Sequence, residues 1–548
     1  MVKQFKNYFS RWFKSDAVRW IEPAGMVTDI SIYNHTVKKK VPFILSNKGY
    51  ISWYACGPTV YDSTHIGHAC SYIRLDIIRR ILEKYLNTNI VQVMCVTNID
   101  DKIIERSKST NTCWKELTVN YEKEFFSDLA VLNVKSPSVI TRAVDFVPQI
   151  IRFIEHLLAK NLAYRSCDGA VYFSIDNYGQ HGKLKPIEKK PERINQSENI
   201  LIHKRNPADF VLWKQVKQDE PYWRSPWGLG RPGWHISCSA MASEYFGNKV
   251  DIHSGGIDLM FPHHENEESQ CCAFHNVNQW VDYWLHTGFL SVKEEKMSKS
   301  LGNTITVRDY LKANSPNYLR MLCLSTHYRS NVDFVGEDVI LSRKLCARFY
   351  EFFDNCRAYV NGYSLKGDID VAKLLEIFEE TKKNVDASLK DDFNTKECIH
   401  LLDDLMTVTN SMIFADTLNG VRNVATVCCV SSYVEEMMEF FGFNFSDRSI
   451  SETDVDNVAS HLENIIDASV SFRNEVRNLA LGLKKSKNTE IKDIHKNLLT
   501  LCDDFRGKFN HFGVALKDRK DDMATWNFVK LDAKDKKSGE FFFYHYLF

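Results

Sequence analysis

The chain has 548 residues, 44% of them hydrophobic and 26% charged, which is long enough for several domains and ordinary for a globular protein. Its 70 basic and 70 acidic side chains balance, so a polyanion must be bound by a local patch and not by the charge of the whole chain. Fifteen cysteines, an odd number without regular spacing, indicate free thiols in a reducing compartment, and no apolar run is long enough to span a bilayer.

The first 25 residues carry five basic side chains, and Asp16 is their first acidic residue. Apolar side chains at helical spacing would form one face of a helix there: Val2, Phe5, Phe9 and Trp12. A basic amphipathic start of this kind predicts an organelle transit peptide over residues 1–25. The alternative is an ordinary basic helix or an unstructured start.

The chain continues with the pattern of a βαβ unit. Apolar runs at 50–54 and 90–96 predict buried strands, and apolar residues at helical spacing predict a helix over 69–86 between them. Such a unit has parallel strands and a right-handed crossover. The turn before the helix contains His65 and His68, at a position where free backbone N–H groups and the helix dipole favour a phosphate. This pattern predicts the first unit of a nucleotide-binding α/β domain.

The remaining segments complete the predicted architecture. In chain order they are helices over 102–163, a non-helical stretch over 164–230, a helix over 239–246, a strand near 283–288, and helices almost throughout from 336. The stretch from about 130 to 230 is interpreted as an insertion between the halves of the nucleotide-binding fold. The predicted fold class is α/β: a Rossmann-like parallel-sheet catalytic domain over 26–335 with that insertion, followed by an all-α region over 336–548.

Four dispersed residues have the side chains of a zinc site. Cys56 ends the first predicted strand, Cys238 lies at the start of a helix, and His263 and Glu267, four residues apart, share one face of another helix. Thiolates and an imidazole suit zinc, and a carboxylate can complete the ligands. His264 is a rival ligand to its neighbour His263, and inert buried thiols are the alternative for the cysteines.

A second set of residues suits a nucleotide. His65 and His68 are positioned to stabilise charge on an α-phosphate, and Lys296 and Lys299 lie in a loop that could clamp the pyrophosphate leaving group. Asp258, which follows two glycines, could accept hydrogen bonds from ribose hydroxyls. The alternatives are a solvated surface loop for the lysines and a tight turn with a capping aspartate for Asp258.

These motifs resemble a known family. The pair His65-Ile-Gly-His68 and Lys296-Met-Ser-Lys-Ser300 resembles the signature of class I aminoacyl-tRNA synthetases. Four further motifs resemble cysteinyl-tRNA synthetases in particular: Cys56-Gly-Pro-Thr-Val-Tyr61, Gly233-Trp-His-Ile-Ser-Cys238, Asp251-Ile-His-Ser-Gly-Gly256 and Phe261-Pro-His-His-Glu-Asn-Glu267. The resemblance runs from about residue 28 to residue 530 and, with the N-terminal segment, is greatest to the animal mitochondrial form.

The resemblance implies an activity and its partners. It implies ATP-dependent activation of L-cysteine to cysteinyl-adenylate, with Mg²⁺ accompanying ATP, and transfer to the 3′-terminal adenosine of cysteine tRNA by a monomer. One zinc ion per chain would be held by the four residues named above, and Gly57, Thr97 and Trp234 match positions that surround the amino acid. Lys299 matches the ATP-contacting lysine of the signature loop. The implied location is the mitochondrial matrix, with the cytoplasm as the alternative.

The C-terminal region bears on two rival functions. Residues 513–519 with Thr525 and Trp526 resemble the segment that reads the anticodon, with Asp518 and Trp526 as candidate contacts. A small-amine cysteine ligase would lack this long region, which argues against that rival. A catalytically inactive zinc- and tRNA-binding protein would not need the intact histidines and lysines of the signature. A lysine-rich strip over 484–496 suits tRNA phosphates or, equally, a solvated helix face.

Overall fold

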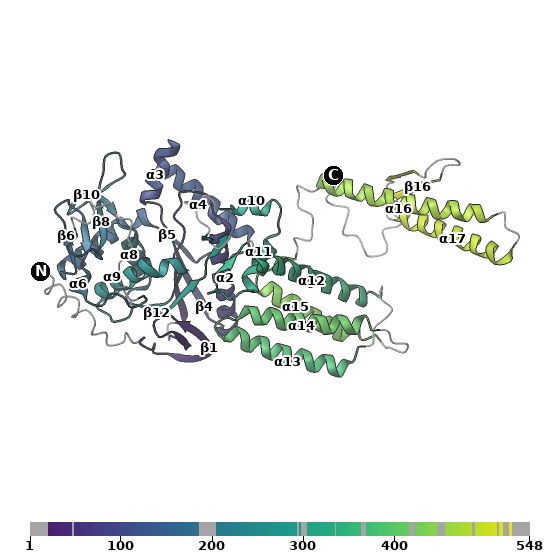
Figure 1. Cartoon of the computed structure of the whole chain (residues 1–548), viewed down its shortest axis with the longest axis horizontal. Helices are drawn as coiled ribbons and strands as arrows, with labels where there is room; N and C mark the ends of the chain where they lie inside the picture. Colours follow the sequence, from purple (N-terminus) through teal and green to yellow (C-terminus); the bar gives the residue numbers. More distant parts are fainter. Residues whose placement is uncertain are drawn as a thin grey trace. The chain divides into compact units, whose positions relative to one another are not determined.

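The computed structural model describes residues 20–46, 49–185, 204–292, 295–296, 304–334, 336–362, 369–415, 422–445, 455–484, 488–511, 514–518 and 525–528. The chain divides into two compact units, Met1–Asn444 and Phe445–Phe548, which are taken separately (Figure 1). In the described part of the chain no helix is both long and apolar enough to cross a membrane.

A five-stranded parallel sheet lies at the centre of the first unit. Its strands, in spatial order, are β12 (Val281–Thr287), β11 (Val250–Gly256), β3 (Tyr50–Ala55), β4 (Asn89–Val96) and β5 (Val139–Arg142). All seven residues of β12 are buried, as expected for a parallel sheet covered on both faces. The predicted runs at 50–54 and 90–96 are strands β3 and β4, paired in parallel as expected, and the predicted α/β fold class is confirmed.

The start of one helix and the presence of one short strand differ from the sequence prediction in this part of the chain. The helix predicted over 69–86 is α2 (Ile66–Leu86), which begins earlier because His65 caps it and accepts the backbone N–H of His68. The prediction of helices throughout 102–163 is wrong at β5, a four-residue strand that lies between α4 (Trp114–Val131) and α5 (Val147–Ala159). A strand of four residues has too few positions to show a period of two, and it forms here because β4 offers a parallel edge.

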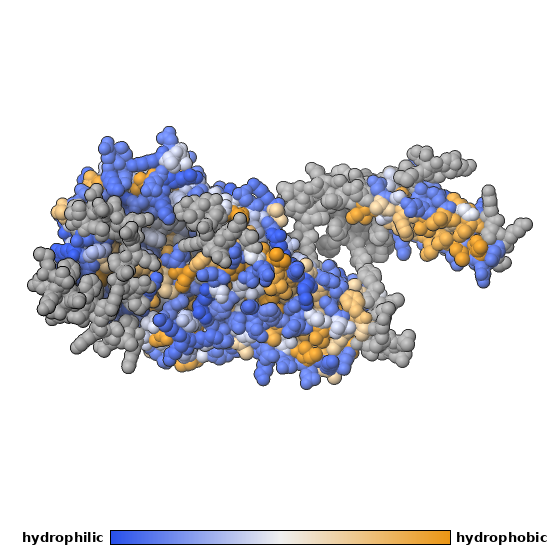
Figure 2. All heavy atoms as spheres, in the orientation of Figure 1, coloured by the Kyte–Doolittle hydropathy of each residue, from blue (hydrophilic) through white to orange (hydrophobic). Residues whose placement is uncertain are grey.

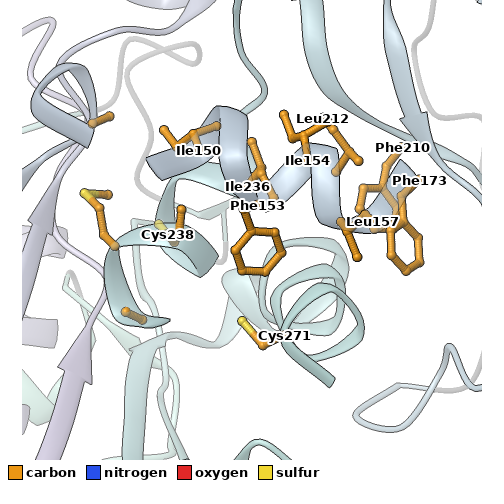
Figure 3. Packing of buried hydrophobic residues seen from close by; sticks show 14 of the residues in the cluster. Ile150, Phe153, Ile154, Leu157, Phe173, Phe210, Leu212, Ile236, Cys238 and Cys271 are labelled. Atoms are coloured by element: carbon orange, nitrogen blue, oxygen red, sulfur yellow. The ribbon is translucent and has the colours of Figure 1, made fainter. Parts of the chain in front are cut away.

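A second five-stranded sheet follows β5 in the chain, and its described strand pairs are antiparallel. It contains β6 (Ala163–Arg165), β7 (Val171–Phe173), β8 (Phe210–Gln215), β10 (Gly228–Pro232) and β9 (Trp223–Ser225). One hydrophobic cluster joins this sheet to α5, α8 (Trp234–Phe246) and α9 (Glu265–His275). Figure 3 shows Ile154 and Leu157 of α5 lying beside Leu212, Phe173 and Phe210, with Ile236 and Cys238 in the same cluster. The second sheet therefore braces the helix that carries Cys238, and this helix begins before the predicted start at 239.

The rest of the first unit is largely helical. The hairpin of β1 (Met26–Asn34) and β2 (Lys39–Leu45) precedes the central sheet, and α10 (Val307–Leu311) and α11 (Pro316–Leu324) follow it. Short strands β13 (Leu290–Val292), β14 (Glu295–Lys296) and β15 (Val332–Asp333) form a small separate sheet. Four helices then pack on one another: α12 (Glu337–Val360), α13 (Val371–Lys390), α14 (Thr395–Ile413) and α15 (Val424–Phe440).

The described part of the second unit consists of two long helices and a β-hairpin. Helices α16 (Val455–Leu483) and α17 (Thr489–His511) pack together, and β16 (Val514–Lys517) pairs with β17 (Thr525–Phe528). The hairpin was not foreseen in a region predicted to be all-α. Figure 2 shows apolar residues gathered on the surface of these helices, where Phe472, Leu479 and Leu501 are exposed.

Candidate active site and metal centre

Four of the predicted residues meet in the interior of the first unit. One ligand atom from each of Cys56, Cys238, His263 and Glu267 lies within 4.8 Å of all the others, and all four side chains are buried. Cys56 directly follows β3, Cys238 belongs to α8, His263 lies in the turn Met260–His264, and Glu267 lies in the first turn of α9. The parallel pairing of β3 with β11 and the packing of α8 on α9 therefore assemble groups that are up to 211 residues apart.

Hydrogen bonds and ion pairs orient these side chains. His263 Nε2 lies 3.0 Å from Glu267 Oε1, and His263 Nδ1 lies 2.8 Å from His235 Nδ1. The other oxygen of Glu267 lies 3.1 Å from His253 Nε2. Burial alone would raise the pKa of Glu267, but the two neighbouring imidazoles, His253 and His263, lower it to about 2. A charged carboxylate, an imidazole and two thiols in a buried position fit a thiophilic divalent cation.

A second ligand set overlaps the first. Cys56, His253, His264 and Glu267 also lie within 4.8 Å of one another. His264 Nδ1 is 2.8 Å from His286 Nε2, whereas His264 Nε2 and His253 Nδ1 are buried without a hydrogen-bond partner among the described residues. The rival prediction for His264 therefore stays open. His253 was missed from the sequence, and its signal was its place in the strand that ends at Gly255 and Gly256.

A third thiol that the sequence analysis did not select borders the same cluster. Cys95 lies in β4, and its Sγ is 3.6 Å from Cys238 Sγ. The backbone N–H of Gly57 donates to Cys95 Sγ at 3.4 Å. Within an apolar run, Cys95 has the appearance of an ordinary core residue. The available signal was its position near the carboxyl end of a parallel strand, where open sheets bind their ligands.

The residues predicted to surround the substrate amino acid lie near this cluster. A Cβ on Gly57 would be 1.8 Å from the carbonyl oxygen of Cys95, so only glycine fits there. Thr97 is buried, and its N–H donates to Pro58 O at 3.0 Å. Trp234 begins α8 with its ring centroid 4.5 Å from that of His263, and its exposure of 37% shows that solvent reaches this side of the cluster. Asp258 lies in the turn after β11.

Three of the four residues predicted to bind the phosphates of ATP lie in the described part of the chain. The rings of His65 and His68 stack with centroids 3.8 Å apart at the start of α2. The N–H of Ile66 donates to Ile305 O at 3.0 Å, so the chain that follows the predicted lysine loop passes beside these histidines. Lys296 belongs to β14, and Lys299 lies outside the described residues.

The candidate anticodon residues have partners within the second unit. Asp518 Oδ1 lies 2.6 Å from Arg473 Nη1, and Arg477 and Arg506 are also near this carboxylate. The indole N–H of Trp526 donates to Asp467 Oδ1 at 2.7 Å. These contacts hold the hairpin on α16 and α17, and a role of either residue in reading tRNA stays a prediction.

Comparisons with known proteins identify the family. A model of the class I (C) tRNA synthetase catalytic domain matches residues 42–344. A probable mitochondrial cysteine–tRNA ligase of Xenopus tropicalis is 41% identical over 541 residues, covering 95% of this chain and 93% of that protein. The chain belongs to the cysteine–tRNA ligase family. The predicted resemblance is thereby confirmed: the chain is a class I aminoacyl-tRNA synthetase, a class of enzyme that uses ATP, an amino acid and tRNA.

The chain is also similar to cysteine–tRNA ligases that are not named as mitochondrial. A cytoplasmic cysteine–tRNA ligase of Dictyostelium discoideum is 35% identical, covering 94% of this chain and 80% of that protein. The cysteine–tRNA ligase of Thermococcus onnurineus is 37% identical, covering 89% and 97%. The structure of a Mycobacterium tuberculosis methionyl-tRNA synthetase in complex with methionyl-adenylate superposes with a TM-score of 0.51 at 14% identity, covering 72% and 90%, which shows the shared fold.

Proposed function

We propose that this cysteine–tRNA ligase family member activates L-cysteine with Mg²⁺-bound ATP and transfers the cysteinyl group from the adenylate to the 3′-terminal adenosine of cysteine tRNA. The observation that carries the proposal is the buried group of two thiols, an imidazole and a carboxylate in a class I synthetase domain. That donor set has no evident use in binding ATP or tRNA, whereas it suits recognition of a thiol.

Zinc is the metal that this donor set fits. Cys56, Cys238, His263 and Glu267 would hold the ion, which would supply a preference for the thiolate of cysteine over the hydroxyl of serine. His235 contacts the nitrogen of His263 that faces away from Glu267, and so fixes the ring. A selective thiol site of this kind removes the need for a separate editing step against serine.

Gly57, Thr97 and Trp234 are proposed to surround the amino acid. The close approach of Gly57 to strand β4 leaves no side chain between the substrate and the sheet. Trp234 offers an apolar ring beside His263, on the side of the cluster that solvent reaches. Thr97 is held at the end of β4 by backbone hydrogen bonds to Pro58 and Val60, which fixes its position relative to Gly57.

The nucleotide is proposed to bind at the start of α2. His65 and His68 would donate hydrogen bonds to the α-phosphate as charge develops there, and Asp258 would accept from the ribose. Lys296 and Lys299 would hold the pyrophosphate. The contact between Ile66 and Ile305 supports this assignment, because it ties the chain beyond the lysine loop to the histidine turn.

The proposed site of action is the mitochondrial matrix, with the protein acting as a monomer. The basic start of the chain and the mitochondrial relative in Xenopus support this location, and the cytoplasmic relative in Dictyostelium is the competing indication. Fusion of residues 1–30 to a fluorescent reporter decides between them. Import is expected, and a diffuse cytoplasmic signal would reject the matrix.

The decisive test compares Cys238→Ser with Cys271→Ser, a buried cysteine of the same hydrophobic cluster that belongs to neither ligand set. Cys238→Ser is expected to lose bound zinc and to slow cysteine-dependent pyrophosphate exchange by more than about 100-fold, because a hydroxyl replaces a thiolate ligand. Cys271→Ser should keep both properties. Full exchange by a zinc-free Cys238→Ser protein would contradict the assignment. For the unmodified protein, pyrophosphate exchange without charging of cysteine tRNA would favour the small-amine ligase.

A further inference from the structure

A buried arginine of α2 reaches the segment that leads into the loop carrying Lys296. Arg74 is 3% exposed and lies about two and a half turns beyond His65, the residue that caps α2. Its Nη1 donates to the carbonyl oxygen of Gly288 at 2.9 Å, and its Nη2 donates to Thr326 Oγ1 at 3.1 Å. Gly288 directly follows β12 and Thr326 follows α11, so one guanidinium joins α2 to segments that are 214 and 252 residues away in the chain.

The carbonyl that Arg74 binds lies at the base of this loop. Strand β13 begins two residues after Gly288 and pairs with β14, which places Ser291 opposite Lys296. The N–H of Gly288 donates to Tyr328 O at 2.9 Å, so both polar groups of this residue are bound. The backbone of Lys296 is therefore joined to α2 through a short paired stretch whose first residue is held by the Arg74 side chain.

The far end of the same loop is tied to the cap of α2. Residues 305–307 run antiparallel beside residues 64–66, joined by backbone hydrogen bonds of 2.9 and 3.0 Å. Both ends of the loop are thus bound to α2 or to the turn that starts it. One tie is made by the backbone, and the other depends on the side chain of Arg74.

The partners of Arg74 are those of a residue that directs a backbone. Buried Arg320, by contrast, pairs with Asp76 of α2 at 2.8 Å, whereas the hydrogen bonds of Arg74 in the described part of the chain go to neutral oxygens. Burying a cation without a carboxylate costs more than burying an aliphatic side chain of similar size. What the guanidinium adds in return is a fixed direction for two N–H donors, one toward the loop base and one toward the end of α11.

We propose that Arg74 is a positioning residue for cysteine activation, which holds the loop base at Gly288 so that Lys296 lies within reach of the pyrophosphate while the histidine turn meets the α-phosphate. This inference rests on the roles proposed above for Lys296 and the two histidines. Arg74 touches neither ATP nor cysteine in this arrangement. It acts only through the backbone that carries Lys296.

Pyrophosphate exchange by the full chain tests the proposal. Arg74→Met is expected to raise KM for pyrophosphate by about 10-fold and to slow saturated exchange by about 10- to 100-fold, because a displacement of about 1 Å has effects of that size. KM for cysteine should stay within about twofold of wild type, since Arg74 does not act on that half of the site. Arg79→Met is the matched control: it removes a guanidinium of the same helix that binds Glu83 and Ser136 O, and both KM values should be unchanged.

Two further variants separate positioning from a loss of folding. Thr326→Val keeps the side-chain volume and removes one acceptor of the guanidinium, so KM for pyrophosphate should rise by about 2- to 5-fold with an unchanged circular dichroism spectrum. This variant keeps the test decisive if Arg74→Met folds poorly. In a Lys296→Ala background, Arg74→Met should add less than about twofold, because both changes remove the same contact with pyrophosphate.

Two outcomes would overturn the inference. One is a rise in KM for cysteine as large as that for pyrophosphate in Arg74→Met, which would show a general structural role. The other is an effect of Arg74→Met that multiplies in full with that of Lys296→Ala, which would show that Arg74 does not act through Lys296.

Lys296→Ala alone distinguishes failure of the inference from failure of the proposed function. If Lys296→Ala raises KM for pyrophosphate while Arg74→Met and Thr326→Val leave it unchanged, only the inference fails. If Lys296→Ala leaves it unchanged, the proposed role of Lys296 is wrong and the inference falls with it.

Discussion

Glu267 and Asp282 are both buried carboxylates, yet their pKa values move in opposite directions. Burial raises the pKa of each, but two histidines reverse this effect at Glu267, where the pKa falls to about 2. At Asp282, by contrast, the effect of burial prevails. Lys249 at 3.1 Å offsets it only in part, so the pKa rises to about 6. The difference lies in the number of partners close to the charge, because a single half-exposed lysine compensates for less desolvation than two buried imidazoles.

Asp282→Asn should stabilise the protein at neutral pH. Because the folded-state pKa lies above the ordinary value of 3.8 for an aspartate, the stability that protonated Asp282 contributes is complete below about pH 4 and is lost as the pH rises through 6. A pKa raised from 3.8 to about 6 corresponds to about 3 kcal/mol, reduced by the lost contact with Lys249, so a gain of about 1–3 kcal/mol is expected at pH 7.5. Urea denaturation at pH 4.5 and 7.5 measures it, with exposed Glu155→Gln as control. An equal effect at both pH values would contradict the burial argument.

At the scale of elements, the first turn of α9 joins three parts of the first unit. Its acidic residues lie where the helix dipole favours negative charge, and each has a different partner. Glu265 accepts backbone N–H groups from residues 182–184, at 2.7–3.1 Å. Glu267 meets the histidines of the site, and Glu268 accepts the N–H of Trp280 just before β12. The same turn therefore fixes the segment at 182–184, the proposed metal ligand Glu267 and the edge of the central sheet.

Glu265→Gln should release the segment at 181–185 from α9. Glutamine keeps the size of the side chain but turns an amide N–H₂ toward backbone donors, which leaves buried groups unpaired and costs about 2–4 kcal/mol. We expect a lower thermal midpoint and faster tryptic cleavage after Lys183, which is followed by Leu184. Glu244→Gln, an exposed carboxylate on α8, is the control. Cleavage at the wild-type rate would show that other contacts hold the segment.

Local patterns in the sequence were sufficient to predict strands β3 and β4 and the helix between them, but not short β5 or every side chain of the candidate site. The runs that became β3 and β4, and the turn at His65, are encoded by neighbouring residues, so they could be predicted. Cys95 could not be selected in this way, because what distinguishes it is a contact with Cys238, 143 residues away in the chain. His253 belongs to the same class, since its significance comes from Glu267 on a different element. Short β5 was missed because its pairing partner, and not its own pattern, makes it a strand.

At the scale of the whole molecule, the groups proposed for catalysis and those proposed for tRNA recognition belong to different units. The described candidate residues for cysteine and ATP all precede Asn444, and α12–α15 pack within that first unit. The second unit has its own small hydrophobic cluster, formed by Ile466, Val470, Val514 and Leu516. The Arg473–Asp518 ion pair adds a contact between α16 and the hairpin. Each unit therefore has hydrophobic and polar contacts of its own.

A protein that ends at residue 444 should separate the two half-reactions. Because it retains the proposed metal ligands and the turn at His65, we expect cysteine-dependent pyrophosphate exchange within about threefold of the full chain, while charging of cysteine tRNA falls by more than about 100-fold. Circular dichroism checks that the shortened protein is folded, and the same protein with His68→Ala gives the background of the exchange assay. If the folded protein loses exchange, the second unit takes part in adenylate formation. If it still charges tRNA at the full rate, the anticodon role predicted for residues 513–526 is wrong.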